Sequence, residues 1–461
     1  MEKEQVLGYV KESLPEAVEK LKEYLRFPTV SAQHKAIPET VAYVVKMIED
    51  IGGETKVLSG LGGNPVVYGF FAAGSKGDAS KTLLYYNHYD VQPPEPFEEW
   101  NTEPFEPTIL EGKLFARGAA DNKGDLVARL TAIQILQQAE GGLPCNIKFM
   151  IEGEEEIGSP NLEPYIQEYK ELFAADACIW EFGGKDEAER IGMVAGIKGM
   201  AYMELTCVGA DIDMHSSVGA YVDNAAWRLV QALGTMKNQQ NEILVKGFYD
   251  GIIEPTEDEK KVVAELPFDE AAVTELYGLK RPLITEAKGT DPRDAMVFHP
   301  TMTICGLVSG YIGEGAKTVL PKSAKAKVDC RLVPGQDPDH ILACIQQHLN
   351  DHGFTDIQVK MINGQKAYRS DFHHPFVAHV LNTARLVYEN EPVLAPNAAG
   401  TGPMFAFGEA LQLPIVSTGV GWVGCKVHAP NESIRLKDFE EGIAHMVFLI
   451  SGFAQALDRT N

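Results

Sequence analysis

Short apolar runs, most of them followed by a helical pattern, recur in the first and last parts of this chain and constrain its fold most. Four of them are typical of buried strands: residues 82–86 (TLLYY), 147–151 (IKFMI), 177–180 (ACIW) and 414–416 (PIV). The segment LVARLTAIQILQQ at 126–138 places apolar residues on one helical stripe, and Gly141-Gly142 ends that helix. Strands that alternate with helices indicate an α/β sheet with helices on both faces.

The middle of the chain follows a different order of elements. The sequence predicts strands at 201–208, 301–307, 324–332 and 356–361, and helices at 224–236 and after Pro338. This order, β-α-β-β-α-β, is the ferredoxin-like pattern. An acidic stretch at roughly 238–298 interrupts it, and we expect surface structure there. We therefore expect one domain at 1–194 and 371–461, split by the insertion of a second domain at 195–370.

The charge balance argues against one class of partner. The 461 residues include 41 Lys and Arg against 65 Asp and Glu, a formal net charge of -24, whereas a phosphate backbone is bound by clustered basic side chains. No apolar run approaches the ~20 residues that span a bilayer. The seven cysteines are scattered without a CxxC pair, and the N-terminal segment is charged throughout. We therefore expect a cytoplasmic protein with neither nucleic-acid nor membrane partners.

Potential metal ligands follow each of the four apolar runs. His88, Glu156, Glu181 and His428 come after the four predicted strands in turn, and Asp121 lies in a turn before a helix. Taken singly, each has an ordinary alternative, because an acidic residue after a strand is usually a turn, cap or solvated surface residue. Ligands bind beyond the carboxyl ends of the strands in open α/β sheets, so these groups are expected to converge. Their joint occurrence favours a metal site.

Five separated segments carry a resemblance to a known family. HYDVQP, EPFEEWNTEPFEP, RGAADNKG, EGEEEIGS and HAPNE occur in this order. Together they resemble the di-zinc exopeptidases, which include carnosinase-type dipeptidases, glutamate carboxypeptidases, aminoacylases and succinyl-diaminopimelate desuccinylases. SGYIGEGAKTVLP and VDCRLVPGQDP look closest to the carnosinase-like dipeptidase branch. The resemblance implies a mixed-sheet, three-layer α/β/α catalytic domain with an inserted ferredoxin-like lid and dimerisation domain.

The resemblance also implies a set of metal ligands. Asp121 would bridge two divalent metal ions, His88 and Glu181 would complete one site, and Glu156 and His428 the other. A bridging carboxylate is expected physically, because two dications ~3.5–4 Å apart repel each other unless an anion lies between them. Nitrogen and oxygen ligands suit Zn²⁺, the favoured ion here, and also Mn²⁺ or Co²⁺.

Three further residues match catalytic positions of the family. Glu155 is the candidate general base, which takes a proton from the attacking water and hands it to the leaving amine. Asp90, two residues past His88, would orient that imidazole. His215 matches the histidine that stabilises the tetrahedral oxyanion, and in dimeric relatives this histidine comes from the neighbouring subunit. The resemblance therefore implies a homodimer.

Four residues match substrate-contact positions. Arg331 resembles the arginine that clamps a substrate carboxylate, a role that suits its planar fork of donors. Thr318, Gly400 and Thr401 resemble other contact positions. A strand arginine in a surface ion pair is the ordinary alternative for Arg331.

The resemblance implies a metal-dependent exopeptidase, a dipeptidase or a small-peptide carboxypeptidase. An N-acyl-amino-acid amidohydrolase with the same site is the alternative, and a catalytically silent binding protein on the same fold is the alternative outside enzymes. Glu181 stands where many dipeptidase-type relatives carry Asp and where carboxypeptidase and aminoacylase types carry Glu. Asn87 and Tyr89 flank His88 where relatives often have Gly and a smaller residue. These departures bear on specificity rather than on activity.

Overall fold

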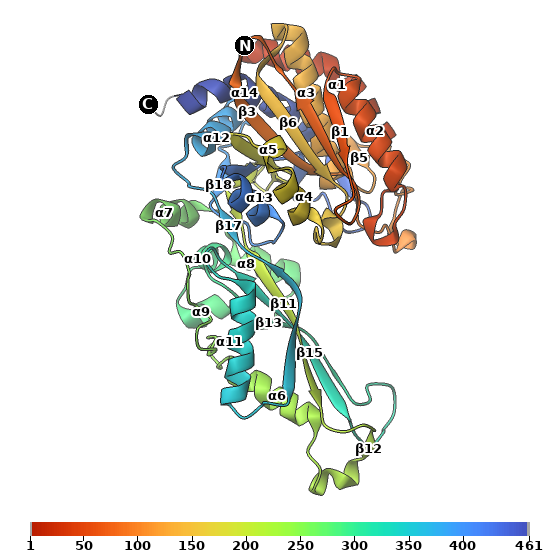
Figure 1. The fold of residues 1–461 in the computed structure, drawn as a ribbon, viewed down its shortest axis with the longest axis vertical. Coiled ribbons are helices and arrows are strands. Elements are labelled where there is room, and N and C mark those ends of the chain that lie inside the picture. Colours follow the sequence, from red (N-terminus) through yellow and green to blue (C-terminus); the bar gives the residue numbers. More distant parts are fainter. Residues whose placement is uncertain (1, 459–461) are drawn as a thin grey trace. The chain divides into compact units, whose positions relative to one another are not determined.

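The computed structural model describes residues 2–458, and the chain divides into two compact units (Figure 1). Unit 1 comprises Met1–Gly196, Arg369–Pro396 and Gly402–Asn461, and unit 2 comprises Ile197–Tyr368 and Asn397–Thr401. The sequence-based boundaries kept 397–401 in the first domain. In the structure this segment groups with unit 2, because the backbone N–H of Lys198 donates to the carbonyl of Gly400 at 3.0 Å.

Unit 1 is built, within the described residues, on a ten-stranded mixed sheet. In order across the sheet the strands are β1 (Glu54–Leu58), β2 (Val66–Phe71), β6 (Leu143–Glu152), β3 (Ala73–His88), β7 (Ala177–Trp180), β19 (Ile415–Ser417), β9 (Ile191–Val194), β8 (Gly184–Lys185) and β20 (Gly421–Trp422), with β18 (Val393–Ala395) paired to β9. Strands β6, β3, β7 and β19 run parallel, so their carboxyl ends lie at one edge of the sheet.

Helices cover both faces of this sheet (Figure 1). One face packs against α1 (Lys3–Leu25), α2 (Ile37–Glu49), α3 (Gly124–Glu140), α12 (Pro375–Val387) and α14 (Leu436–Asp458), and the other against α4 (Leu162–Glu168), α5 (Lys170–Phe173) and α13 (Met404–Leu411). Successive side chains of β3 point to opposite faces of the sheet, so this strand packs against both helical layers. Leu83 and Tyr85 join the core of the first face, whereas Tyr86 contacts Trp180 and Phe407 on the second. The predicted three-layer α/β/α arrangement is confirmed.

A small sheet and several short helices complete unit 1. The sheet has the order β21 (Ser433–Arg435), β5 (Lys113–Phe115), β4 (Thr108–Leu110). The short helices are η1 (Ser31–Gln33), η2 (Phe97–Glu99), η3 (Ala119–Lys123) and η4 (Glu155–Ile157). Pairing of β21 with β5 brings the segment before Ser433 beside the segment that leads into η3.

Unit 2 has the predicted ferredoxin-like order. Its antiparallel sheet runs β13 (Thr303–Ser309), β15 (Ser323–Leu332), β11 (Gly199–Val208), β16 (Ile357–Gln365), with α6 (Ala225–Met236) and α11 (Pro338–Asp351) against it. Alternate residues of β11, from Ala201 to Cys207, are buried with these helices. The acidic stretch forms α7 (Glu257–Glu265), α8 (Glu270–Tyr277), α9 (Ile284–Lys288) and α10 (Pro292–Phe298). The remaining short elements are β12 (Met214–His215), η5 (Ser216–Ala220) and β14 (Val319–Leu320), with β10 (Gly196–Ile197) and β17 (Tyr368–Arg369) where the chain passes between the units.

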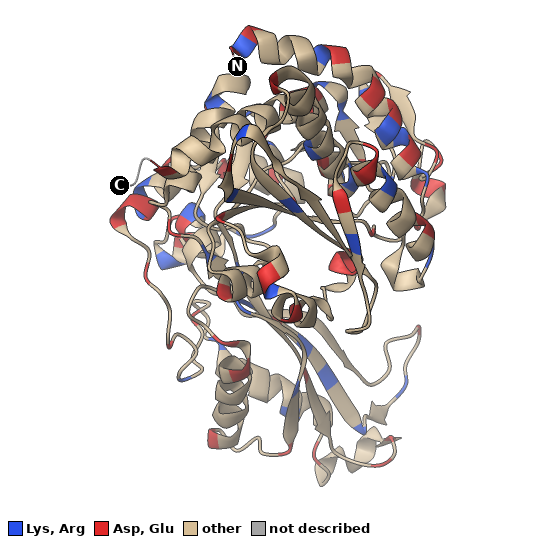
Figure 2. Ribbon diagram, turned by 45° about the horizontal axis from the view of Figure 1, so that its top comes forward, with Lys and Arg blue, Asp and Glu red and all other residues tan. Residues whose placement is uncertain are grey.

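Acidic and basic residues alternate along the first two helices of unit 1. Figure 2 shows acidic and basic residues interspersed along α1 and α2. Continuous basic surface would be expected of a protein that binds a phosphate backbone. Among residues 2–458, none of the helices combines the length and the hydropathy that a bilayer crossing requires.

Candidate metal centre and active site

Three of the predicted ligands lie near the carboxyl ends of neighbouring strands. His88 is the last residue of β3, Glu181 directly follows β7, and Glu156 lies in η4 just beyond β6. Strands β6, β3 and β7 are adjacent and parallel, so these ends meet at one edge of the sheet. Asp121 lies in η3, which leads directly into α3. The sheet topology therefore brings His88, Glu156 and Glu181 together, and the start of α3 presents Asp121.

Asp121 lies between two histidines. One oxygen of its carboxylate is 3.0 Å from Nε2 of His88, and the other is 3.1 Å from Nε2 of His428. Nε2 of His88 is also 3.4 Å from Oε2 of Glu181, and Nε2 of His428 is 3.1 Å from Oε2 of Glu156. The five predicted ligands thus form two groups that share Asp121. Ligand atoms of His88, Asp121 and Glu156 all lie within 4.8 Å of one another.

The electrostatics of the cluster fit bound cations. Burial raises the pKa of Glu181 well above its usual range, and neighbouring carboxylates such as Asp121 add to the shift. Burial alone would lower the pKa of His88, yet Glu181 and Asp121 hold it well above its usual range. Hydrogen bonds to Asp121 and Glu156 raise the pKa of His428 to about 10. Within the described residues, the buried Oε2 of Glu181 has no hydrogen-bond partner. A crowded set of carboxylates that stabilises positive charge on its histidines is a donor set suited to divalent metal ions.

Glu155 lies next to the cluster and is partly exposed. Burial of its carboxyl group raises the pKa of Glu155 to about 8; His88 opposes the shift, and Asp121 and Glu156 add to it. Cations bound nearby would lower this pKa again. A carboxylate that titrates near neutrality beside the cluster has the properties of a general base.

His428 reaches the cluster by a different route from the predicted one. The apolar run at Pro414 was expected to lead to His428, but β19 ends at Ser417 and His428 lies in a later turn with φ of 60°. The strand-end prediction was wrong for this residue. The segment after Ser417 does not continue the strand, because the N–H of Val420 donates to the Asp125 side chain at 2.8 Å instead of to a neighbouring strand. The side chain of His428 is 54% exposed.

His215 and the four predicted substrate-contact residues belong to unit 2. Oγ1 of Thr318 lies 3.3 Å from Nε2 of His215, so these two residues come together. Arg331 donates through Nη1 to Thr401 at 2.8 Å and through Nε to Asp329 at 3.0 Å. Gly400 directly precedes Thr401. The predicted contact residues of unit 2 therefore form two separate groups.

The two groups lie at opposite ends of one strand. Thr318 lies just before β14, and the N–H of Lys322, directly before β15, donates to Asp213 at 3.0 Å. Arg331 lies near the other end of β15. A strand rises about 3.3 Å per residue, so Ser323 and Arg331 are about 26 Å apart. His215 and Arg331 of one chain are therefore too far apart to contact the same small substrate.

A comparison with protein families decides the class of the protein. Residues 84–451 match the family described as Peptidase family M20/M25/M40. The chain belongs to this peptidase family. The matched stretch contains all five candidate ligands and extends over both units. This M20 family member is a hydrolase that acts on peptide bonds, and the predicted class of enzyme is confirmed.

Relatives of this M20 peptidase cover most of its length. It is 36% identical to the M20 family metallo-carboxypeptidase Sso-CP2 from Sulfolobus solfataricus, with a TM-score of 0.88 over 95% of this chain and 98% of that chain. It is 27% identical to the Cys-Gly metallodipeptidase dug1 of Schizosaccharomyces pombe, covering 93% of both chains. It is 28% identical to the Beta-Ala-His dipeptidase of Homo sapiens, covering 78% of this chain and 72% of that protein. The expected resemblance is therefore confirmed, with dipeptidases and a carboxypeptidase among the relatives.

Asp90 and Gln92 contact the candidate ligands His88 and Glu156 of this M20 peptidase. Nδ1 of His88 lies 3.0 Å from the backbone oxygen of Asp90 and 3.3 Å from its carboxylate. The other carboxylate oxygen of Asp90 accepts the backbone N–H of Glu156 at 3.1 Å. Gln92 donates to the Glu156 side chain at 2.9 Å. Asp90 was predicted from the sequence, and Gln92 was not. The only sequence signal for Gln92 is its place in the HYDVQP segment, two residues after Asp90.

Glu432 supports the site in a way that was not predicted from the sequence. This residue lies in the HAPNE segment, is fully buried, and pairs with the buried Arg117 at 2.8 Å. Its carboxylate also accepts backbone N–H groups of Gly118, Ala120 and Asp121 at 2.9 to 3.1 Å. Glu432 therefore holds the turn that presents Asp121.

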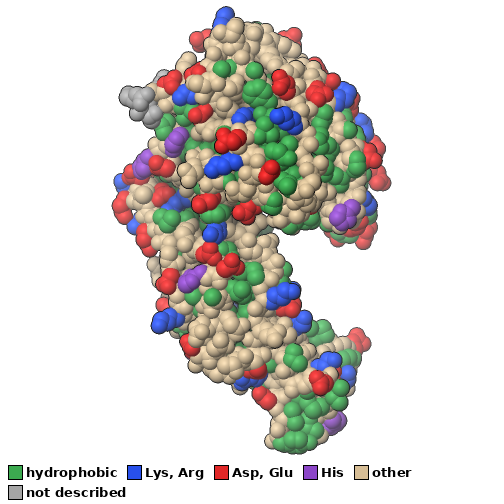
Figure 3. Space-filling model, in the orientation of Figure 1, with side chains coloured by type: hydrophobic (Ala, Val, Ile, Leu, Met, Phe, Trp, Pro, Cys, Tyr) green, Lys and Arg blue, Asp and Glu red, His purple; other side chains and the backbone are tan. Residues whose placement is uncertain are grey.

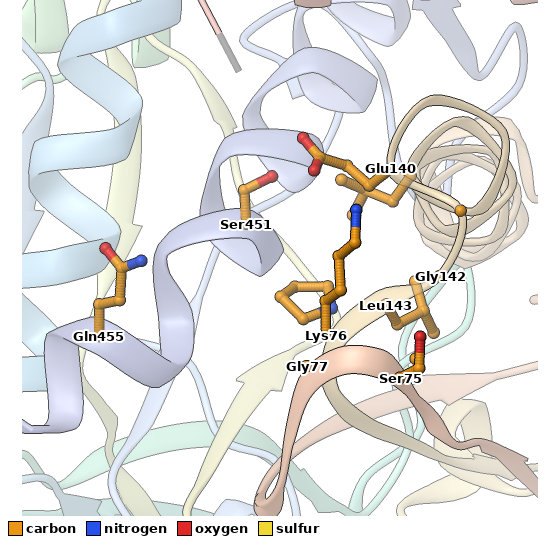
Figure 4. Close-up of a pocket in the computed structure, with 12 residues that line it drawn as sticks. Ser75, Lys76, Gly77, Glu140, Gly142, Leu143, Ser451 and Gln455 are labelled. Atoms are coloured by element: carbon orange, nitrogen blue, oxygen red, sulfur yellow. The ribbon is translucent and has the colours of Figure 1, made fainter.

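A cavity of about 420 Å³ lies elsewhere in unit 1 (Figure 4). Ser75 and Lys76 line it from β3, Glu140 from the end of α3, and Ser451 and Gln455 from α14. It is at the amino ends of β3 and β6, the opposite ends from the candidate ligands. None of the predicted site residues lines this cavity.

Proposed function

We propose that this protein is a metal-dependent exopeptidase, a dipeptidase or a small-peptide carboxypeptidase, that holds two divalent metal ions. In this proposal His88 and Glu181 hold one ion, Glu156 and His428 hold the other, and Asp121 holds both. The observation that carries the proposal is the position of Asp121, whose two carboxylate oxygens each face one histidine. Zn²⁺ is the favoured ion, and Mn²⁺ or Co²⁺ would fit the same donor atoms.

The proposed chemistry is attack of water on a scissile peptide carbonyl. Bound divalent cations would supply positive charge that polarises the carbonyl and acidifies water. Glu155 takes a proton from the attacking water and returns it to the leaving amine. Its position next to the proposed ligand Glu156 and its raised pKa support this role. Asp90 contacts Nδ1 of His88 and holds the orientation of the imidazole.

The proposed active form is a homodimer in which His215 serves the site of the second copy. His215 would stabilise the oxyanion that develops on the attacked carbonyl. The separation of His215 from Arg331 along β15 supports this division, because one substrate can then contact Arg331 of one copy and His215 of the other.

Exposed apolar surface on unit 2 supports a second copy as the partner. The edge strand β13 exposes about half of the Ile304, Leu307 and Val308 side chains, and Trp227 on α6 is 65% exposed. Figure 3 shows hydrophobic side chains gathered at the end of unit 2 that carries β12 and α6. An unpaired edge strand with apolar side chains is suited to pairing with a strand of another chain.

The proposed substrate is a small peptide with a free carboxylate. Arg331 would grip that carboxylate, and Gly400 and Thr401 would line the same place. The hydrogen bond from Arg331 to Thr401 supports the grouping of these residues. The relatives named as dipeptidases and as a carboxypeptidase support a peptide rather than an N-acyl amino acid. We also propose a cytoplasmic location, which the seven free cysteines support.

The substrate proposal is tested with two sets of compounds. The protein, loaded with Zn²⁺, Mn²⁺ or Co²⁺, is incubated with a library of dipeptides and with N-acetyl and N-succinyl amino acids. We expect turnover of dipeptides and, within that set, a loss of turnover when the C-terminal carboxylate is amidated. Turnover of the acylated amino acids alone would replace the peptidase by an amidohydrolase. Turnover of neither set by metal-loaded protein would favour a silent binding protein.

The metal proposal is tested independently of any substrate. Metal content per chain is measured after reconstitution and removal of unbound metal. We expect about two ions for the wild type and fewer for Asp121→Asn, whose amide offers one acceptor oxygen in place of two. A wild-type protein that binds no metal would end the proposal.

A further inference from the structure

Arg129 is a buried arginine behind the candidate metal site, and the proposed chemistry does not use it. It lies on α3 and is 1% exposed. Its Nη1 donates to the carbonyl of Tyr86 and to the side chain of Asn87, both at 2.7 Å. Its Nη2 donates to the carbonyl of Trp180 at 2.5 Å and to that of Thr418 at 3.3 Å. One guanidinium group therefore joins the ends of β3, β7 and β19.

The positions of these acceptors relate Arg129 to one group of ligands. Asn87 directly precedes His88, and Trp180 directly precedes Glu181. A shift of either backbone segment would move His88 or Glu181 with it. Arg129 thus holds the main chain that carries the two ligands which the proposal assigns to one metal ion alone.

A chain of buried amides extends this contact from Asn87 to Glu181. The Asn87 side chain donates to that of Asn122 at 2.5 Å, and Asn122 donates to the backbone carbonyl of Glu181 at 2.7 Å. Asn87 and Asn122 are both buried, and Asn122 directly follows Asp121. Buried polar groups that satisfy one another in this way specify one arrangement of the main chain.

The second group of ligands is held by other contacts. Glu156 is contacted by Asp90 and Gln92, and no hydrogen bond of Arg129 among the described residues reaches Glu156 or His428. Asp90 contacts both halves of the proposed metal centre, whereas the hydrogen bonds of Arg129, in the described part of the chain, reach only the half that contains His88 and Glu181.

We propose that Arg129 is a positioning residue that sets the affinity of the metal ion held by His88 and Glu181, and not of the ion held by Glu156 and His428. The planar fork of an arginine matches carbonyl acceptors that converge from three strands, whereas a lysine ammonium has three donors and no plane. Groups that support metal ligands in this way change metal affinity by about 10- to 100-fold when they are replaced. The inference rests on the ligand set proposed above.

The test measures metal binding rather than activity. Wild type, Arg129→Met and Arg129→Lys are loaded with Co²⁺ and titrated with a competing chelator, while bound metal is counted and the visible absorption of Co²⁺ is recorded. Lys148→Met is the matched control, because Lys148 also donates to a backbone carbonyl of unit 1, that of Ala174 before β7. We expect both Arg129 variants to release one ion at a chelator concentration about 10- to 100-fold lower than the wild type requires. The other ion should stay bound.

Double variants identify which ion is released. His88→Ala already weakens the first group, so Arg129→Met should add little to it, whereas Arg129→Met combined with His428→Ala should leave almost no bound metal. If Arg129→Met does not fold, Asn87→Leu interrupts the same network and should weaken the same ion. Two ions bound with wild-type affinity by folded variants would overturn the inference, and so would equal weakening of both ions. A wild type that binds no metal would instead overturn the ligand set itself.

Discussion

The side chain of Glu432 accepts the backbone N–H of Asp121 at 3.1 Å, although the two residues lie 311 positions apart in the sequence. The same carboxylate binds the side chain of Arg117 and the N–H groups of Gly118 and Ala120. One buried acidic group therefore fixes the backbone of the turn that presents the proposed bridging carboxylate. Because Asp121 is shared by both proposed ions, this contact is expected to matter for the whole metal centre.

Replacement of Glu432 should weaken both stability and metal binding. In Glu432→Gln the side-chain NH₂ faces backbone N–H donors, so at least one buried donor loses its acceptor. We expect the free energy of unfolding, measured with urea in the presence of a chelator, to fall by about 1–3 kcal/mol. Metal affinity should fall by about 10-fold or more. Glu103→Gln, which changes an exposed carboxylate of the same unit, is the control, and an effect of equal size there would contradict the explanation.

Replacement of Glu155 should separate catalysis from metal binding. Glu155→Gln removes the proposed proton acceptor, and none of the proposed ligands is changed. We expect the rate of peptide hydrolysis to fall by about 10²- to 10⁴-fold while metal content per chain stays at the wild-type value. Glu154→Gln is the matched control, since the neighbouring Glu154 accepts a hydrogen bond from Asn161 at 2.8 Å and has no proposed role in the reaction. A Glu155→Gln protein that keeps its rate would remove Glu155 from the mechanism.

Mixed dimers should report whether His215 acts across subunits. His215→Ala and Glu155→Ala chains are each expected to be inactive alone. If His215 serves the second copy, a mixed dimer has one complete site, and random exchange of subunits should restore about a quarter of the wild-type activity. The measurement is activity after exchange, with the mixed dimer isolated by two different affinity tags. No recovery in the isolated mixed dimer would place His215 with its own chain's site or outside catalysis.

Local sequence patterns were sufficient for most elements of the sheet and for the strand-end ligands. Residues 177–180 form β7 as predicted, and the predicted helix at 224–236 corresponds to α6 at Ala225–Met236. Such elements can be predicted because burial on a sheet or a helix face requires a regular spacing of apolar residues. The position of Glu181 follows from the same pattern, because a ligand that directly succeeds a buried strand lies at the carboxyl end of that strand.

Contacts between distant polar residues could not be predicted in the same way. Arg129 lies on the helix whose apolar stripe was recognised, but nothing in the local pattern indicates that its guanidinium reaches the carbonyls of Tyr86 and Trp180. The pairing of Glu432 with Asp121 depends on the packing of β21 beside β5. His428 does not lie at a strand end because β19 ends at Ser417 and the chain turns before it reaches the cluster. In each case the partner is determined by tertiary packing rather than by neighbouring residues.

The buried His445 should make unit 1 less stable at mildly acidic pH. Its ring lies among Thr383, Thr418 and the backbone of Val380, and burial lowers the pKa of His445 from 6.5 to about 4. Between these two pH values the unfolded chain binds a proton at His445 that the folded chain does not, so stability falls as the pH falls from about 6.5 towards 4. The full shift corresponds to about 3 kcal/mol, and about 2 kcal/mol of this is expected to be lost by pH 5.

The measurement that checks this is urea unfolding of metal-free protein at pH 7.5 and pH 5. His445→Gln cannot gain the proton, so the wild type should lose about 2 kcal/mol more than the variant between the two pH values. The difference between the two losses does not contain the contribution of the metal-centre carboxylates, because these carboxylates are present in both proteins. His34→Gln, which replaces an exposed histidine of the same unit, controls for the loss of an imidazole as such. If the wild type and His445→Gln lose the same stability on acidification, burial of His445 does not contribute to the acid sensitivity of unit 1.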